Sequence, residues 1–182
     1  MNLLLPCLRV PRLAELEFSR LADRGIVYYC LDVDNTVARV GSWEPAPGVG
    51  EALAPARAAG FVRDACLLSN VILGAARIRR LDHLAAMLGI RHAYAARFWD
   101  RKPSPRPFRW AMQRMSSDPA TTAVVGDQLH TDILGGNRLG LYTVLVKPLG
   151  PDHWTTRLTG RRRRERALLA GPDPQTGEGR WG

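Results

Sequence analysis

The amino-acid sequence predicts an α/β protein with a doubly wound parallel sheet in a single domain. Short apolar runs of the kind that form buried strands alternate along the chain with segments of helical periodicity. Such alternation implies parallel strands joined by helical crossovers. A chain of 182 residues is long enough for one domain with a sizeable core and short for two. We therefore expect one domain over residues 1–172, with a helical lead-in, and a disordered tail over 173–182.

The expected elements follow one another in a regular order. Nearly continuous apolar runs identify the strands, apolar residues three and four positions apart identify the helices, and glycines and prolines separate them. The strands are expected at 26–31, 65–68, 92–95, 122–125 and 142–146, and the helices at 13–21, 49–59, 78–88, 108–115 and 131–139. A loop over 41–48, which contains Trp43, Pro45 and Pro47, is expected to overhang the end of the first strand.

The chain is strongly basic. Lys and Arg outnumber Asp and Glu by 26 to 17, which gives a formal net charge of +9. Such an excess attracts anionic surfaces such as nucleic acid or acidic phospholipid. The alternative is that the charge serves solubility in an arginine-rich proteome, and composition alone does not separate the two.

Localisation follows from what the sequence lacks. No window approaches the ~20 apolar residues that a membrane-spanning helix requires. Residues 1–10 are apolar but are broken by proline and make no convincing signal peptide. Cys7, Cys30 and Cys66 show no CxxC spacing, so we expect reduced core thiols. A cytoplasmic protein with at most peripheral membrane contact is therefore expected.

Two carboxylates, Asp32 and Asp34, directly follow the first expected strand and precede Asn35 and Thr36. In open parallel sheets the ligand site forms where strands end. An aspartate there can attack phosphorus, and a carboxylate two residues on can protonate the leaving oxygen and later activate water. Two carboxylates so close together favour a hard cation such as Mg²⁺. The pattern indicates phosphoryl transfer, and the alternative is an Asx turn that ends the strand.

The other strand ends carry candidates for the same site. Ser69 ends the second strand, Lys102 follows the third, and Asp127 and Asp132 follow the fourth. A phosphoryl group in transfer requires hydroxyl or amide donors, a fixed cation and a metal around its oxygens. Singly, these residues could be a turn residue, a surface cation and a helix cap. Because such residues follow every strand in turn, we expect them to share one crevice.

In this order, D-x-D-N-T at 32–36, S-N at 69–70, K-P at 102–103 and G-D-x-x-x-x-D at 126–132 resemble the motifs of the haloacid dehalogenase (HAD) superfamily of phosphatases. The stretch GDQLHTDILGGNR, with Leu5-Pro6, Gly25-Ile26 and the pattern at 156–166, resembles the YqeG branch of its subfamily IIIA. The resemblance implies a Rossmann-like fold. The spacing of the motifs leaves no room for an inserted cap domain, so a capless fold with an open crevice is expected.

The resemblance also implies roles for the acidic residues and the lysine. Asp32 would be the nucleophile that forms an aspartyl-phosphate, and Asp34 the general acid and base. Asp32, the backbone carbonyl of Asp34, and Asp127 would hold Mg²⁺, and Asp132 would support both the metal and Lys102.

Further implied contacts concern the phosphoryl group and the substrate. Ser69 would join the lysine in holding the phosphoryl oxygens, while Asn35 and Thr36 would orient the loop and, with Asn70, contact substrate. Val71 stands where relatives tend to carry a second asparagine, a difference expected to affect leaving-group contacts.

An open crevice suits a large substrate, and the YqeG-like resemblance favours phosphatidylglycerophosphate, which would become phosphatidylglycerol. Residues 1–10 and Trp99 are candidates to touch the lipid interface, and the alternative for Leu3 to Leu5 is that they cover the core. Several basic residues could hold the enzyme against anionic lipid, and the alternative for the arginines is a solvated face. These residues are Arg77, Arg79, Arg80, Arg97, Arg101 and the cluster 161–166.

The sequence leaves two alternative functions open. One is a phosphatase for nucleotides or nucleic-acid ends, and the other is a non-catalytic module that binds RNA or the ribosome. Aromatic and basic residues do not alternate as they do in a base-stacking platform, which disfavours nucleic acid as a partner.

Overall fold

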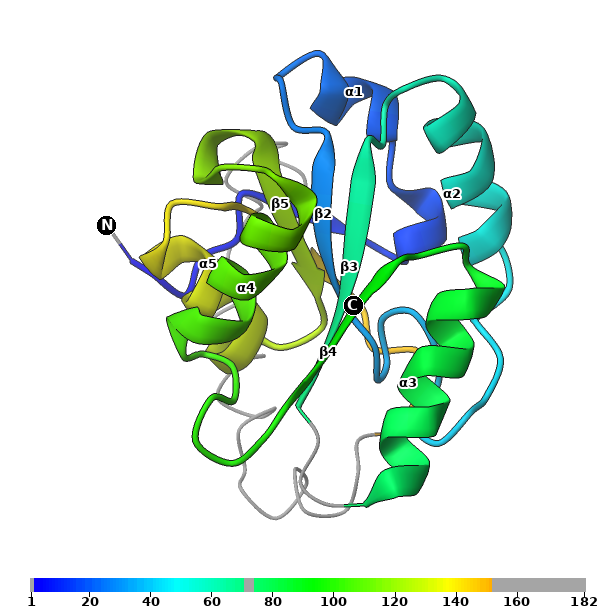
Figure 1. Ribbon diagram of the computed structural model, residues 1–182. Coiled ribbons are helices and arrows are strands. Elements are labelled where there is room, and N and C mark those ends of the chain that lie inside the picture. Colours follow the sequence, from blue (N-terminus) through cyan, green and yellow to red (C-terminus); the bar gives the residue numbers. More distant parts are fainter. Residues whose placement is uncertain (1, 71–73, 152–182) are drawn as a thin grey trace.

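The computed structural model describes residues 2–70 and 74–151. Its centre is a six-stranded, wholly parallel sheet in the order β1-β6-β5-β2-β3-β4 (Figure 1). The strands are β1 (Leu8–Val10), β2 (Tyr28–Asp32), β3 (Asp64–Asn70), β4 (His92–Ala96), β5 (Thr122–Gly126) and β6 (Tyr142–Val146). The predicted doubly wound α/β fold is confirmed, and each of the five expected strands is present.

Helices cover both faces of the sheet. Figure 1 shows α2 and α3 on one side and α4 and α5 on the other. The α-helices are α1 (Phe18–Ala22), α2 (Val49–Ala58), α3 (Ala75–Met87), α4 (Pro105–Met115) and α5 (Leu134–Arg138). The helix α4 begins at Ser104, whose hydroxyl accepts a hydrogen bond from the Arg106 N–H. Such a cap satisfies one of the free donors at a helix start.

The strands supply two cores because successive side chains point to opposite faces. In β2, Tyr29 and Leu31 join the larger core, which also contains α2 and α3 residues, while Cys30 joins the core beneath α4. The buried α4 side chains in that core are Phe108, Ala111, Met112 and Met115. This two-sided burial explains why the central strands are continuous apolar runs.

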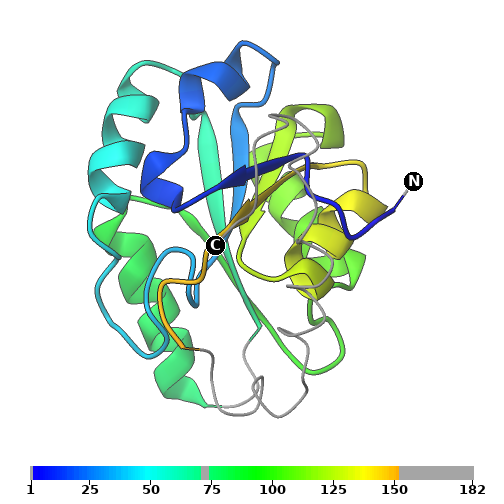
Figure 2. The same cartoon turned by 180° about the vertical axis from the view of Figure 1, so that it is seen from behind.

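The N-terminal segment contains a strand that the sequence did not reveal. Residues Leu8–Val10 pair in parallel with β6, at the edge of the sheet, where Figure 2 shows β1 beside β6. Further support comes from Asn137, whose side-chain amide donates to the carbonyls of Leu3 and Leu5. Two flanking prolines hid this strand, because edge pairing tolerates proline close by whereas central pairing does not.

Two of the expected helices are interrupted. The region 13–21 forms a 3-10 turn at Leu13–Glu15 and then α1, because Leu16 and Glu17 adopt non-helical backbone angles. The region 131–139 forms a π-helical turn at Leu129–Ile133 that continues into α5. Apolar periodicity marked the buried face in both cases but did not detect the non-helical residues in the first region or the π-helical turn in the second.

No helix within residues 2–70 and 74–151 is long and apolar enough to cross a membrane. Val71, the pattern at 156–166, the arginine cluster 161–166 and the tail predicted over 173–182 lie outside the described residues.

Candidate active site

The candidate site lies at the carboxyl edge of the sheet, beside β2. The chain runs from β2 outward to β3 and β4, and then returns to place β5 on the other side of β2. Connections therefore leave β2 and β5 in opposite directions and open a crevice between them. Asp32 is the last residue of β2, and Asp127 follows the last residue of β5. The topology thus brings together two of the carboxylates predicted from sequence.

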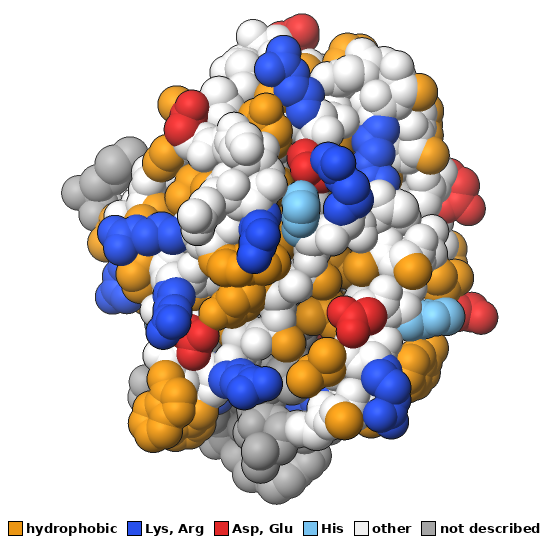
Figure 3. Space-filling model, viewed as in Figure 1, with side chains coloured by type: hydrophobic (Ala, Val, Ile, Leu, Met, Phe, Trp, Pro, Cys, Tyr) orange, Lys and Arg blue, Asp and Glu red, His pale blue; other side chains and the backbone are white. Residues whose placement is uncertain are grey.

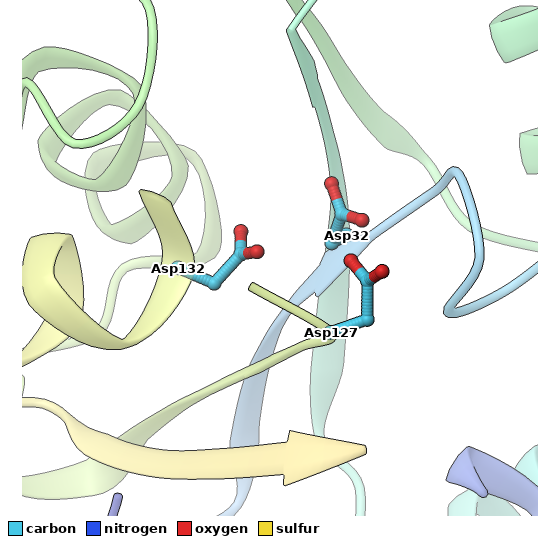
Figure 4. Close-up of side chains that lie close together, drawn as sticks. All are labelled: Asp32, Asp127 and Asp132. Atoms are coloured by element: carbon cyan, nitrogen blue, oxygen red, sulfur yellow. The ribbon is translucent and has the colours of Figure 1, made fainter. Parts of the chain in front are cut away.

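Three buried carboxylates meet in this crevice. Asp32, Asp127 and Asp132 offer oxygen atoms that all lie within 4.8 Å of one another. Figure 4 shows their carboxylates gathered at the ends of β2 and β5 and on the turn that precedes α5. A buried carboxylate is stable in its ionised form only beside a cation, and oxygen donors suit a hard divalent ion. The donor set fits a metal such as Mg²⁺.

Lys102 supplies a fixed positive charge to this cluster. Its Nζ donates to Asp32 Oδ1, to Asp132 Oδ1 at 2.7 Å and to the Leu68 carbonyl at 3.0 Å, so all three ammonium hydrogens have acceptors. Burial by itself would lower the pKa of Lys102, but Asp132 and Asp32 outweigh it and raise the pKa. The lysine therefore stays protonated at physiological pH.

Both carboxylate oxygens of Asp32 accept a hydrogen bond. Lys102 donates to Oδ1, and the Thr36 hydroxyl donates to Oδ2 at 3.4 Å. Burial raises the pKa of Asp32 to about 7; the Lys102 ammonium opposes this rise and the Asp132 carboxylate adds to it. A cation bound beside Asp32 would favour its ionised form.

Asp34 does not belong to the cluster of three side chains. Its side chain is 42% exposed, and Oδ1 forms an ion pair with Arg80 Nη1 at 2.8 Å. The backbone carbonyl, which the resemblance assigns to the metal, is a separate group. The structure therefore leaves the carboxylate of Asp34 at the mouth of the site rather than within the metal cluster.

Arg80 corrects an expectation from the sequence. The sequence places it among arginines that could face anionic lipid, but it is 8% exposed and points from α3 to the loop after β2. Its position one helical turn before the buried Leu84 was the available signal, because it places the guanidinium stem on the apolar face. Arg77 and Arg79, by contrast, are exposed.

Ser69 and Asn70 complete the β3 side. Leu68 is paired in register with Asp32, so the buried Ser69 lies one residue further along, at the carboxyl edge. The Asn70 side chain accepts from the Lys102 N–H at 2.8 Å and donates to the Lys102 carbonyl at 3.2 Å. Asn70 thus holds the backbone that carries the lysine, and its contact with substrate stays a prediction.

The loop that follows Asp32 turns sharply at Asn35. This residue is buried and has a φ of 66°, in the left-handed region that asparagine tolerates better than most residues. Its N–H donates to the Ala38 carbonyl at 2.7 Å. The buried Thr36 follows and donates a hydrogen bond back to Asp32, so both residues contribute to the shape of the loop, and their contact with substrate stays a prediction.

The glycines of the stretch 126–138 allow close packing around Asp132. A Cβ on Gly126 would lie 2.3 Å from Asp132 Cγ, so only glycine leaves room for this carboxylate. A Cβ on Gly135 would lie 2.4 Å from Phe108 Cε2 in α4, and one on Gly136 would lie 2.4 Å from Val124 Cγ1 in β5. The motif therefore seats α5 between α4 and the sheet, which fixes Asp132 in the crevice.

The sequence is similar to those of known phosphatases. Residues 99–148 match the HAD-hydrolase-like family. The chain is 31% identical over 153 residues to "Probable phosphatase YqeG" of Bacillus subtilis (strain 168). The aligned region covers 84% of this chain and 81% of that protein. It is also 53% identical to human chronophin over 45 residues, which is 25% of this chain and 15% of chronophin.

The fold has a solved counterpart in a protein from Mesorhizobium loti that is assigned as an HAD-like phosphatase. The two share 18% identity with a TM-score of 0.54, over 88% of this chain and 90% of that one. Together with the buried carboxylates, the lysine and the extended match to YqeG, these findings identify the chain as a member of the haloacid dehalogenase-like family of phosphatases, in its YqeG-like branch.

Proposed function

We propose that the protein is a Mg²⁺-dependent phosphomonoesterase that acts through an aspartyl-phosphate on Asp32, and that its substrate is the phosphatidylglycerophosphate headgroup. One observation supports the chemistry above all others, namely the buried cluster of Asp32, Asp127 and Asp132 around Lys102 at the carboxyl edge of the sheet. A buried cluster of this kind is costly for stability, which favours a functional role.

The reaction has two halves. In the first, an Asp32 oxygen attacks phosphorus and forms a P–O bond while the bond to the leaving oxygen breaks, and Asp34 gives its proton to that oxygen. In the second, Asp34 takes a proton from water, the water oxygen attacks phosphorus, and the bond to Asp32 breaks to release inorganic phosphate. The side chain of Asp34 is 42% exposed, so it would be open to both solvent and a substrate oxygen.

The surrounding charges stabilise the transferring group. The hydroxyl of Ser69, at the end of β3, would donate to a phosphoryl oxygen, and the charge of Lys102 beside Asp32 would offset the negative charge of the phosphoryl group. The side chains of Asp32 and Asp127 and the carbonyl of Asp34 would hold Mg²⁺, with Asp132 in support. When bound, the ion offsets the negative charge of the phosphoryl oxygens and of the carboxylates.

The lipid assignment draws support from the surface beside the site. Phe98 and Trp99 are 68% and 86% exposed and form an edge-to-face pair in the loop between β4 and α4. This loop also carries Lys102, and Arg97 and Arg101 flank the aromatic pair. Figure 3 shows basic side chains spread over one face of the molecule, with apolar ones between them. Exposed tryptophan beside arginine suits the surface of an anionic membrane.

The test is phosphate release from phosphatidylglycerophosphate in mixed micelles, with and without Mg²⁺. An aryl phosphate and a 3′-phosphorylated oligonucleotide are assayed beside it, and Asp32→Asn is the control. Lipid turnover that needs both Mg²⁺ and Asp32, and that exceeds turnover of the other two, would support the proposal. Turnover of the oligonucleotide alone would replace the substrate assignment, and absence of all turnover would favour a non-catalytic module.

A further inference from the structure

The guanidinium of Arg80 joins α3 to the loop that carries Asp34. Its Nη1 pairs with Asp34 Oδ1 at 2.8 Å, its Nε donates to the Ser42 carbonyl at 2.5 Å, and its Nη2 donates to the Arg39 carbonyl at 3.1 Å. All three acceptors belong to the loop 33–48, and the arginine itself is buried. The Arg80 side chain thus connects three separate residues of the loop to α3.

We propose that Arg80 is a positioning residue that holds the carboxyl of Asp34 in line with the leaving oxygen. The inference rests on the proposed phosphatase function. It extends that function by assigning a part in proton transfer to a residue outside the family-like motifs, and Arg80 would act through Asp34 and not on the substrate.

Without a fixed partner, the side chain of Asp34 would have considerable conformational freedom. Its side chain is 42% exposed and lies on a loop, where alternative rotamers are accessible. General acid catalysis demands that the donor lie within hydrogen-bond reach of the leaving oxygen. A single ion pair to a flexible partner would fix it poorly, because holding two mobile side chains costs entropy.

Arg80 is not a flexible partner. Its planar guanidinium is already fixed by two backbone carbonyls, so binding Asp34 costs little further side-chain entropy. A second contact ties the same two elements together, since the Trp43 ring of the loop packs edge-on against His83 of α3, with ring centroids 5.7 Å apart. The loop and α3 therefore form one rigid support for the carboxyl.

Leaving groups of different basicity provide a readout that a merely structural role would not change. A dinitrophenolate departs as a stable anion and gains little from a proton, whereas phenolate and alkoxide depend on general acid catalysis. The ratio kcat/KM reports the steps up to departure of the leaving group. Mispositioning of Asp34 should therefore lower kcat/KM most for the poorest leaving groups.

The experiment compares Arg80→Met, Arg80→Lys and a control, Arg109→Met, which removes an exposed arginine from α4. For Arg80→Met, kcat/KM should fall by about 10- to 100-fold with phenyl phosphate and by less than about 3-fold with 2,4-dinitrophenyl phosphate. Lysine should restore only part of the loss, because it lacks the planar fork. Arg109→Met should match the wild type with both esters.

A double-mutant cycle separates positioning from simple destabilisation. In an Asp34→Asn background, Arg80→Met should lower kcat/KM by no more than about 2-fold, because the group that it positions is already gone. Equal losses for both esters, or full additivity with Asp34→Asn, would overturn the proposal. If the wild type turns over aryl phosphates but no lipid, the substrate assignment fails while the Arg80 test stands; absence of any turnover overturns both.

Discussion

Lys102 and Asp132 are 30 residues apart in sequence, yet Nζ of the lysine lies 2.7 Å from Oδ1 of the aspartate within the protein interior. The ion pair is part of a cluster of charged groups that also includes Asp32 and Asp127. Because the carboxylates outnumber the lysine, removal of any charged group should change both stability and metal binding.

Lys102→Met should destabilise the metal-free protein by about 3–5 kcal/mol, because buried carboxylates would lose their cation. The measurement is urea unfolding in the presence of a chelator. Adding Asp32→Asn to Lys102→Met should recover part of the loss, since one of the uncompensated carboxylates disappears. A loss below about 1 kcal/mol would show that the lysine does not carry this role.

Asp32→Asn should abolish turnover and also change how stability depends on pH. The native pKa of Asp32 is raised from 3.8 to about 7, so its contribution to stability is fully present below pH 3.8 and is lost as pH rises through 7. The metal-free wild type should therefore lose more stability than Asp32→Asn between pH 5 and pH 8. Thermal melts of both proteins in chelator would check this, and parallel pH curves would contradict it.

Mg²⁺ should raise the Tm of the wild type at pH 7.5, because it binds the native carboxylate cluster and has no comparable site in the unfolded chain. The increase should be lost in Asp127→Asn. A calorimetric titration of both proteins with Mg²⁺ alone would test the donor set without reference to activity. An equal increase in the two proteins would place the ion elsewhere.

Gly126→Ala should lower activity and Mg²⁺ binding together, since its Cβ would lie 2.3 Å from Asp132 Cγ and would displace that carboxylate. Gly50→Ala in α2 is the matched control. Its Cβ would meet only Leu88 Cδ2 at an ordinary 3.9 Å, and alanine favours helix by roughly 0.5–1 kcal/mol. Unimpaired Mg²⁺ binding in Gly126→Ala would show that Asp132 is dispensable for the ion.

Cys30 and Cys66 should resist alkylation in the folded protein. Burial raises the pKa of Cys30 to about 12 and that of Cys66 well above its usual value, so neither forms the reactive thiolate at pH 8. Iodoacetamide followed by mass spectrometry should label only the half-buried Cys7 among the three. Reducing agent should leave activity unchanged, and a loss of activity on reduction would refute the assignment of three free thiols.

Phe98→Ser/Trp99→Ser should weaken sedimentation with phosphatidylglycerol vesicles. It should also reduce lipid turnover at least about tenfold more than turnover of an aryl phosphate, because a buried aromatic ring at the interface favours binding. Met87→Ser, which alters an exposed apolar residue at the end of α3, is the control. Equal vesicle binding by the aromatic variant and the control would remove this loop from the membrane contact.

Much of the site could be predicted from the sequence because its residues directly follow recognisable strands. Asp32, Ser69 and Asp127 each lie at the end of an apolar run, and parallel strands place their carboxyl ends at one edge. The fold class followed from the same alternation of strands and helices. These signals are local, since each depends on a few neighbouring residues in the chain.

The tertiary structure alone decided how those residues are held. The partners of Arg80 and Asn70 could not be predicted from the local sequence, because they lie 32 or more residues away along the chain. The same holds for β1, three residues long, which forms only because β6 provides a pairing edge. The apolar run of a strand lies in consecutive residues, whereas the partner of a buried polar group depends on how distant elements pack. That packing pairs Asp34 with Arg80 and Lys102 with Asp132.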